Sequence, residues 1–148
     1  MMANEVIRII NQSQLKKVNS GFNFDWDRIV RENLTGVLFG FFLDAEPVGL
    51  ILFERREASE FCNEVIDLEV RQDAQHQGIG AKLLAQVMVD AFVQPHFEGF
   101  VHLRTKTNGV ENFYRHLGGE VSRGWVLFDT DASKHVIKRY LPKGGLLR

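Results

Sequence analysis

The amino-acid sequence predicts one α/β domain in which helices flank a mixed sheet of about seven strands. Three observations lead to this prediction: β-prone runs recur along the chain, amphipathic helical patterns interrupt them, and a glycine-containing turn joins a strand to the strongest helix. A chain of 148 residues suits a single domain with a real core and is too short for two ordinary domains. We expect that domain to cover residues 1–142 and residues 143–148 to form a loose C-terminal tail.

The first third of the chain is predicted to contain one strand and two short helices. Residues 6–10 are rich in β-branched side chains, which favours a strand, and residues 12–18 follow with an apolar face at helical spacing. Asp25 is a favourable N-cap for the second helix, predicted over residues 26–33. The aromatic residues in the loop between the helices either pack at the edge of the core or line a pocket for an acceptor.

Three strands are predicted in the middle of the chain. Apolar runs at residues 36–43 and 48–54 flank a turn sequence at residues 44–47, so they are expected to form an antiparallel hairpin. The third run, residues 65–70, alternates in the manner of a strand with one buried face. The residues expected on its core face are Ile66, Leu68 and Val70.

The second half of the chain is predicted to begin with its strongest helix, residues 79–92, whose apolar side chains form one continuous stripe. A strand at residues 99–105 and a short helix that Gly118 terminates come next. The chain is then expected to end with a hairpin of two strands, residues 120–130 and 134–141.

Composition excludes several classes of protein. Hydrophobic residues at 45% and charged residues at 25% are ordinary values for a folded globular protein, which argues against disorder. A net charge of -1 gives no general attraction to nucleic acid or to an anionic membrane, so we predict no nucleic-acid partner and no membrane partner. With no secretory pattern at the N-terminus and no apolar run of about 20 residues, a cytoplasmic location is expected.

Cysteine and histidine usage predicts neither a disulfide nor a metal site. Cys62 is the only cysteine, so no intrachain disulfide can form, and we expect it to pack as a buried strand residue rather than to act as a nucleophile. Four histidines outside the glycine-containing turn are not at the spacings of metal ligands, so no metal is predicted. These histidines are His96, His102, His116 and His135.

The stretch from Gln75 to Ala81 joins a predicted strand to a predicted helix and carries the clearest functional signal. Such a junction aims unpaired backbone N–H groups and the positive end of a helix dipole at one point, which attracts phosphate. Gly78 and Gly80 lack a Cβ, so a diphosphate can approach the backbone closely. The spacing fits neither a Walker loop nor a dinucleotide-binding fingerprint, because Gly80 is followed by Ala, Lys and Leu.

Two motifs carry a resemblance to a known family. Gln75, Gly78 and Gly80 match the pattern Gln/Arg-x-x-Gly-x-Gly/Ala, which resembles the pyrophosphate loop of the GNAT superfamily of N-acetyltransferases. Residues 112–118 are similar to the Phe-Tyr-x-x-Leu-Gly segment of that family, and the predicted order of elements is similar to the GNAT arrangement over nearly the whole chain. The resemblance implies a mixed, mostly antiparallel central sheet and acetyl-coenzyme A (acetyl-CoA) as cosubstrate.

The resemblance also implies which residues bind the cosubstrate. The diphosphate is expected on the loop, and the pantetheine arm is expected to pair with the preceding strand like an added strand. The family often has an asparagine seven residues before the tyrosine; Thr107 holds that position here, so the neighbouring Asn108 is the candidate for that contact. The complete predicted set is Leu68, Glu69, Val70, Gln75, His76, Gln77, Gly78, Ile79, Gly80, Ala81, Asn108 and Tyr114.

Tyr114 is the predicted proton donor. A phenol beside the thioester can protonate a departing thiolate, and Tyr114 resembles the family's tyrosine in this role. The alternative is an aromatic residue on the apolar stripe of its helix, whose hydroxyl only finds a hydrogen-bonding partner.

The predicted strand supplies the candidates for a base: Glu64, Asp67 and Glu69. Glu64 is preferred because, counted back from the glycine loop, it occupies the position at which several family members carry a glutamate or histidine base. Its parity with Ile66 and Leu68 is expected to direct it into a partly desolvated cleft, although a solvated carboxylate is the alternative. Glu69 is the second candidate for the base, since a bulge near it would change the face of the sheet toward which each carboxylate points.

The sequence therefore predicts an acetyl-CoA-dependent N-acetyltransferase, in which a primary amine attacks the thioester directly within a ternary complex. The expected acceptor is a small-molecule amine or a protein amine, and the expected assembly is a monomer or a homodimer. The alternative function is a non-catalytic acyl-CoA-binding or regulatory module with the same fold.

Overall fold

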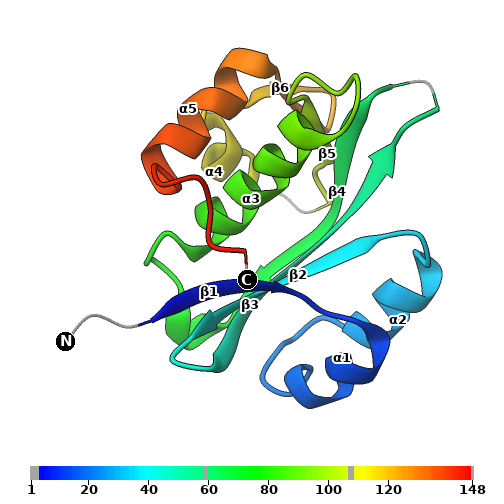
Figure 1. The fold of residues 1–148 in the computed structure, drawn as a ribbon, viewed down its shortest axis with the longest axis vertical. Helices are drawn as coiled ribbons and strands as arrows, with labels where there is room; N and C mark the ends of the chain where they lie inside the picture. Colours follow the sequence, from blue (N-terminus) through cyan, green and yellow to red (C-terminus); the bar gives the residue numbers. More distant parts are fainter. Residues whose placement is uncertain (1–3, 59, 107–108, 148) are drawn as a thin grey trace.

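The computed structural model describes residues 4–58, 60–106 and 109–147 (Figure 1). Within these ranges seven strands form one sheet in the order β1-β2-β3-β4-β5-β7-β6. The strands are β1 (Glu5–Ile9), β2 (Val37–Leu43), β3 (Glu46–Arg56), β4 (Cys62–Val70), β5 (Val101–Arg104), β6 (Glu120–Ser122) and β7 (Trp125–Phe128). The helices are α1 (Gln12–Val18), α2 (Trp26–Glu32), α3 (Ile79–Val93), α4 (Glu111–His116) and α5 (Thr130–Tyr140), with a 3-10 turn at Gln72–Ala74. None of these described helices is long and apolar enough to cross a membrane.

The sheet is mixed and mostly antiparallel, which confirms the predicted fold class. Neighbouring strands run antiparallel except β4 and β5, which are parallel. β4 and β5 pair from Asn63↔Val101 to Val65↔Leu103, after which β5 ends at Arg104 and β4 continues to Val70. The two strands therefore diverge in the middle of the sheet, and the edge of β4 that faces this gap has backbone groups available beyond Val65.

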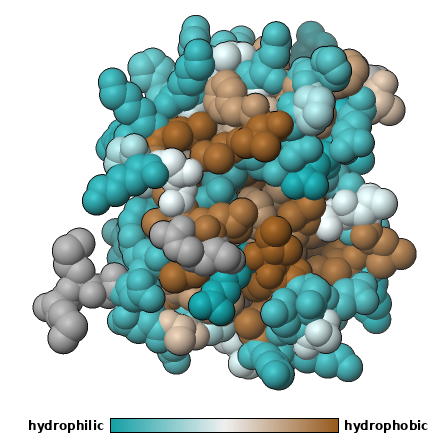
Figure 2. Space-filling model, viewed as in Figure 1, coloured by the Kyte–Doolittle hydropathy of each residue, from teal (hydrophilic) through white to brown (hydrophobic). Residues whose placement is uncertain are grey.

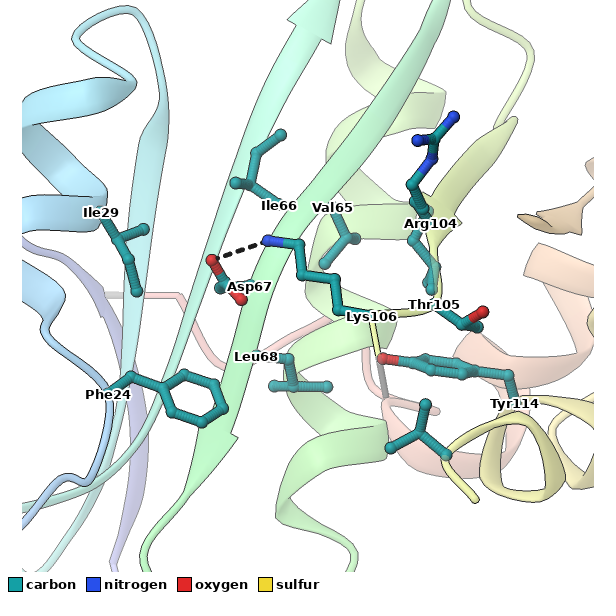
Figure 3. Close-up of a pocket in the computed structure, with 12 residues that line it drawn as sticks. Phe24, Ile29, Val65, Ile66, Asp67, Leu68, Arg104, Thr105, Lys106 and Tyr114 are labelled. Carbon is teal, nitrogen blue, oxygen red and sulfur yellow. Dashed lines mark hydrogen bonds and ion pairs between the residues drawn. The ribbon is translucent and has the colours of Figure 1, made fainter. Parts of the chain in front are cut away.

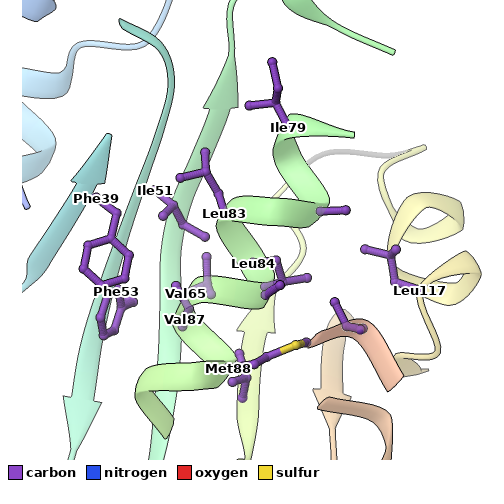
Figure 4. Close-up of a cluster of buried hydrophobic side chains, with 14 of the residues drawn as sticks. Phe39, Ile51, Phe53, Val65, Ile79, Leu83, Leu84, Val87, Met88 and Leu117 are labelled. Atoms are coloured by element: carbon purple, nitrogen blue, oxygen red, sulfur yellow. The ribbon is translucent and has the colours of Figure 1, made fainter. Parts of the chain in front are cut away.

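Helices cover both faces of the sheet. Figure 1 shows α3, α4 and α5 together on one side, and α1 and α2 on the other side near β1, β2 and β3. The larger hydrophobic cluster lies under α3, where Figure 4 shows Leu83 and Val87 of the helix facing Ile51 and Phe53 of β3. A smaller cluster surrounds Trp26 beneath α1 and α2. Burial of these apolar surfaces, at about 25 cal/mol per Å², is the main force that holds the helices on the sheet.

The last predicted strand is wrong, because the chain forms helix α5 there. The Asp129 carboxylate caps this helix by accepting a hydrogen bond from the Ala132 N–H at 2.9 Å. Ala132, Val136 and Tyr140 recur at a spacing of four and pack with Ile137 against the core under α3. The segment has the apolar period of a helix, which the prediction of a hairpin around residues 131–133 overlooked.

The final hairpin lies entirely within the residues predicted as a single strand. Arg123 and Gly124 have positive φ angles of 51° and 82° and form the turn between β6 and β7. Gly124 adopts this conformation without strain because it has no Cβ. The sheet has the predicted number of strands because this hairpin supplies the strand that the helix replaces.

The segment predicted as a loose tail lies against β1. The Ile7 N–H donates a hydrogen bond to the Leu146 carbonyl at 2.9 Å, and Ile7 and Leu147 form a parallel bridge. The Leu146 N–H donates to Gln86 Oε1 of α3 at 3.1 Å. Figure 2 shows apolar side chains gathered across the middle of this face, while most of the surrounding surface is polar. Residues up to 147 therefore pack on the domain.

Candidate functional site

The loop before α3 has the backbone conformation of an anion site. Gly78 is the N-cap residue, with a φ of 79°, and makes no side-chain capping bond. His76, two residues earlier, also has a positive φ of 66°. The first helical bond runs from the Lys82 N–H to the Gly78 carbonyl at 3.0 Å, so the amides of residues 79–81 have no helical carbonyl to bond. The positive end of the α3 dipole lies at the same place.

These amides open into a cavity of about 440 Å³, which we call the loop cavity. It lies between the end of β4, the glycine loop and α4. It brings together nine of the residues predicted to bind the cosubstrate: Leu68, Val70, Gln75, His76, Gly78, Ile79, Gly80, Ala81 and Tyr114. Glu69 and Gln77 do not line it, and Asn108 lies outside the described residues. Gln75 turns back and donates to the Val70 carbonyl at 3.2 Å, which fixes the loop to the strand.

A second cavity, of about 310 Å³, lies where β4 and β5 diverge, and we call it the strand cavity (Figure 3). Its lining is mostly apolar and includes Phe24 and Ile29 from the α1–α2 side. The two cavities share Leu68, Val110 and Tyr114, so they meet at these side chains. Tyr114 is therefore part of the wall of both cavities.

Tyr114 is nearly enclosed, with 8% of its surface exposed. Its ring packs edge-on against the exposed Phe113 and against Phe128 of the core. Burial, and secondarily the negative charge of Asp67, raises the pKa of Tyr114 to about 12. The phenol is therefore fully protonated at neutral pH and can donate a hydrogen bond.

Asp67 is the carboxylate that faces the strand cavity. Its Oδ2 lies 3.1 Å from Lys106 Nζ, and its side chain is only 16% exposed. Figure 3 shows this ion pair between Phe24 and Ile29 on one side and Tyr114 on the other. Both charged groups thus lie at the wall of a mostly apolar cavity, whose lining also includes Arg104 and Thr105.

The parity that grouped Glu64 and Ile66 with Leu68 does not hold, because β4 contains a bulge. Leu52 pairs with Asp67 and Phe53 pairs with Val65, which leaves Ile66 as the extra residue. Ile66 consequently packs in the cluster beneath α1 and α2, while Leu68 packs in the cluster beneath α3. The alternation of side chains between the two faces of the sheet is interrupted at the bulge. Residues that are an even number of positions apart therefore lie on opposite faces when the bulge separates them.

Glu64 lies on the other side of the bulge from the strand cavity and does not line it. Its Oε1 accepts a hydrogen bond from Arg56 Nε at 2.9 Å and lies 3.5 Å from His102 Nε2. The carboxylate is thus already paired with a cation on β3. Its role as a base stays a prediction.

Glu69 is buried at 9% exposure and holds the segment that joins α1 to α2. Its carboxylate accepts hydrogen bonds from the Asn23 N–H at 2.6 Å, the Phe24 N–H at 3.1 Å and Trp26 Nε1 at 2.8 Å. Three donors occupy most of the acceptor capacity of one carboxylate. The residue therefore positions Phe24 at the strand cavity, a function that no local sequence pattern indicated.

Comparison with known proteins agrees with this geometry. A model of the Acetyltransferase (GNAT) family matches residues 4–118. No curated protein matches the sequence. The fold is similar to a GNAT-family protein from Desulfovibrio desulfuricans (16% identity, 86% of this chain and 99% of that chain covered, TM-score 0.70). It is also similar to a Bacillus subtilis acetyltransferase in complex with CoA (16% identity, 80% of this chain and 78% of that chain covered, TM-score 0.59). A third similar structure is AtaTR bound with acetyl-CoA (14% identity, 88% of this chain and 96% of that chain covered, TM-score 0.68).

The solved structures, all at low identity, establish a shared fold, and two of them hold CoA or acetyl-CoA. The family match is independent of that likeness and extends from the residue before β1 to Gly118 after α4, including both motifs and both cavities. Because it covers well over half of the sequence, this chain belongs to the acetyltransferase (GNAT) family.

Proposed function

We propose that this protein transfers the acetyl group of acetyl-CoA to a primary amine, by direct attack of the amine on the thioester in a ternary complex. The observation that carries the proposal is the position of Tyr114, whose side chain lines both the loop cavity and the strand cavity. A cosubstrate in one cavity and an acceptor in the other would meet beside a protonated phenol. The acceptor is a small-molecule amine or a protein amine.

In this proposal the glycine loop and β4 bind acetyl-CoA. The diphosphate accepts hydrogen bonds from the amides of residues 78–81 at the positive end of α3. The pantetheine amides pair with the edge of β4 at residues 68–70, beyond the point where β5 ends. This path leads the thioester toward Tyr114 and the strand cavity.

The reaction needs a neutral amine, because an alkylammonium has no lone pair for the attack. Asp67 is the best-placed carboxylate to attract the ammonium and accept its proton, since it faces the cavity beside Tyr114. The amine nitrogen then forms a bond to the carbonyl carbon, the carbon–sulfur bond breaks, and the Tyr114 hydroxyl supplies the proton of the departing thiol. The nitrogen loses its second proton as the amide forms, and this proton restores the Tyr114 hydroxyl. The first amine proton remains on Asp67 until solvent removes it.

The two proton transfers assist each other electrostatically. The negative charge of Asp67 contributes to the raised pKa of Tyr114, so the phenol is a weak acid while Asp67 is ionised. When Asp67 accepts the amine proton, that charge disappears and the pKa of Tyr114 falls. Tyr114 therefore becomes a better acid at the stage when the thiolate leaves.

The ion pair of Lys106 with Asp67 favours a second candidate function, that of a module that binds acyl-CoA without turnover. The Lys106 ammonium already occupies Asp67, the position that an amine substrate would need. Its side chain is 53% exposed, so an incoming cation can compete with it by moving a flexible chain into solvent. The enzyme requires that exchange, whereas the binding module keeps the pair intact.

Release of free thiol from acetyl-CoA in the presence of a panel of primary amines tests the proposal. We expect amine-dependent release by the wild type, and Tyr114→Phe is expected to lower turnover about 100-fold while keeping acetyl-CoA affinity within a few fold. Tyr140→Phe is the matched control, because Tyr140 lines neither cavity. Tight acetyl-CoA binding with no amine-dependent release would support the binding module, and full turnover by Tyr114→Phe would remove the phenol from the mechanism.

A further inference from the structure

Three side chains with metal-binding atoms meet near the start of β4, outside both cavities. Cys62 Sγ lies 3.6 Å from His102 Nε2 and 3.8 Å from Glu60 Oε2. His102 Nε2 lies 3.4 Å from the same Glu60 oxygen. The three donor atoms thus form a closed triangle, which is the arrangement that one ion can bridge.

The sides of this triangle agree with the size of a zinc ion. Zn²⁺ binds sulfur at about 2.3 Å and nitrogen or oxygen at about 2.0–2.2 Å, usually in a tetrahedron. Tetrahedral angles convert these bond lengths into separations of about 3.3–3.7 Å between neighbouring donors. The three measured separations, 3.4, 3.6 and 3.8 Å, need almost no movement to reach that range.

Burial and charge also suit a cation. Cys62 is 5% exposed and the His102 side chain 18% exposed, while Glu60 is 49% exposed and leaves a path for an ion to enter. Glu64 adds a second carboxylate 3.5 Å from His102 Nε2, and Arg56, which pairs with Glu64, is the cation beside the cluster. With the thiol ionised, three negative charges face one positive charge, so a divalent ion brings the group close to neutrality.

We propose that Glu60, Cys62 and His102 form a zinc site, with water as the fourth ligand. The thiol releases its proton when the Zn–S bond forms, and His102 binds through Nε2 as a neutral imidazole. The ion would link Glu60 and Cys62, at the start of β4, to His102 in the middle of β5. It lies beside the pair Glu64↔His102, one register position before β4 and β5 separate. The site would therefore fix the angle of the cleft that the proposed function uses.

This proposal departs from the sequence-based prediction of no metal, which compared the spacing of histidines along the chain. Cys62 and His102 are 40 residues apart, and only the parallel register of β4 and β5 brings them together. The alternative is a cluster held by weak hydrogen bonds alone, in which His102 donates to a carboxylate and no ion binds.

Titration of the untagged protein with Co²⁺ tests the site. Because Cys62 is the only cysteine, a thiolate-to-Co²⁺ charge-transfer band in the near ultraviolet can arise from that residue alone. We expect one equivalent to bind, with visible absorption of tetrahedral intensity, and Zn²⁺ to displace it. Cys62→Ser should remove the ultraviolet band, and His102→Gln should weaken Zn²⁺ binding by at least about 100-fold in calorimetric titration.

His116→Gln is the matched control at an exposed position of α4, and its affinity for Zn²⁺ should equal that of the wild type. Acetyl-CoA binding and circular dichroism of each variant report whether it is folded. The proposal is overturned if the folded wild type gives no thiolate band. It is equally overturned if the band and the affinity are the same in His102→Gln and Glu60→Gln, since Co²⁺ would then bind Cys62 without the other two ligands.

Discussion

At the scale of single residues, the environment of Tyr114 links the proposed chemistry to stability. The folded pKa of about 12 lies above the ordinary value of about 10, so the folded protein holds this proton more tightly than the unfolded chain does. The resulting stabilisation is present below about pH 10 and is lost as pH rises toward about pH 12. Two pKa units correspond to about 2–3 kcal/mol of unfolding free energy over that interval.

Tyr114→Phe has no proton to lose, so its stability should lack this component. We expect the difference in unfolding free energy between wild type and Tyr114→Phe to fall by about 2–3 kcal/mol from about pH 9 to about pH 12, measured by urea denaturation. Other groups that titrate in this range are present in both proteins and cancel in the difference. A difference that stays constant with pH would mean that Tyr114 ionises as easily in the folded protein as in the unfolded chain.

Asp67 is the residue on which the pH dependence of the rate should depend. An amine of pKa about 10.4 is neutral about once in 2,500 molecules at pH 7, a deficit of about 4.6 kcal/mol without a base. Asp67→Asn keeps the size of the side chain and removes the base, so its rate loss should be largest near neutral pH. The loss should shrink at alkaline pH, where neutral amine forms without help.

Two variants on the same strand serve as controls for this assignment. Glu64→Gln alters the pair with Arg56, and Glu69→Gln weakens the support of Phe24 and Trp26, so each should lower the rate by a factor that does not vary with pH. Rate profiles against pH at saturating acetyl-CoA distinguish the three carboxylates. A larger pH-dependent loss in Glu64→Gln would return the role of base to the residue that the family pattern favours.

At the scale of elements, the start of α3 determines where the cosubstrate binds. A Cβ built on Gly80 would lie 3.4 Å from Phe113 Cζ and 3.7 Å from Val70 Cγ2, so a side chain there extends into the loop cavity without striking the backbone. Gly80→Glu should weaken acetyl-CoA binding by at least about 100-fold, because it adds bulk and negative charge where the diphosphate binds. Gly80→Ala should retain affinity within a few fold.

Calorimetric titration of both variants measures this effect, and thermal denaturation checks that both remain folded. Unchanged affinity in a folded Gly80→Glu protein would place the diphosphate elsewhere. Gly78→Ala is a less specific change, since its φ of 79° is strained for any residue with a Cβ and a loss of affinity could reflect the loop conformation alone.

The glycine loop and α3 could be predicted from residues adjacent in sequence, whereas helix α5 and the bulge in β4 were missed. The glycine loop and α3 follow from residues adjacent in sequence, and the structure places them as expected. Helix α5 was missed because residues 131–133 were interpreted as the turn of a hairpin, although Asp129 caps a helix there and apolar residues recur at a spacing of four. The bulge at Ile66 was missed because its position depends on pairing with β3, which alternation within β4 cannot reveal.

The same distinction explains the candidate site. Tyr114 and the loop residues were identified because a motif carries them, and they line the cavities. Asp67 was a lesser candidate than Glu64 because the family pattern favoured Glu64 and parity was counted through the bulge. Lys106 had no signal at all, since its pairing with Asp67 depends on where the chain emerges from β5.

At the scale of the whole molecule, the proposed cosubstrate connects two parts of the sheet. β1 to β4 form one antiparallel part, β5 to β7 form another, and their direct backbone link is the short parallel pairing of β4 with β5. Helix α3 packs across the sheet and supplies the remaining connection through its apolar side chains. Acetyl-CoA bound along residues 68–70 would extend this connection beyond Val65, into the region where the strands diverge.

A ligand that binds only the folded protein must stabilise it, and the size of the effect can be stated. At an acetyl-CoA concentration 100 times its Kd the stabilisation is about 2.7 kcal/mol. For a chain of this length each kcal/mol raises the melting temperature by about 2–4 °C, so we expect a shift of about 5–11 °C. Amide hydrogen exchange should slow in particular for those of residues 68–70 whose N–H points away from β3, because these groups gain partners. A melting shift without protection of those amides would show that acetyl-CoA binds at the glycine loop alone, and an equal shift in Gly80→Glu would show that it binds outside the loop cavity.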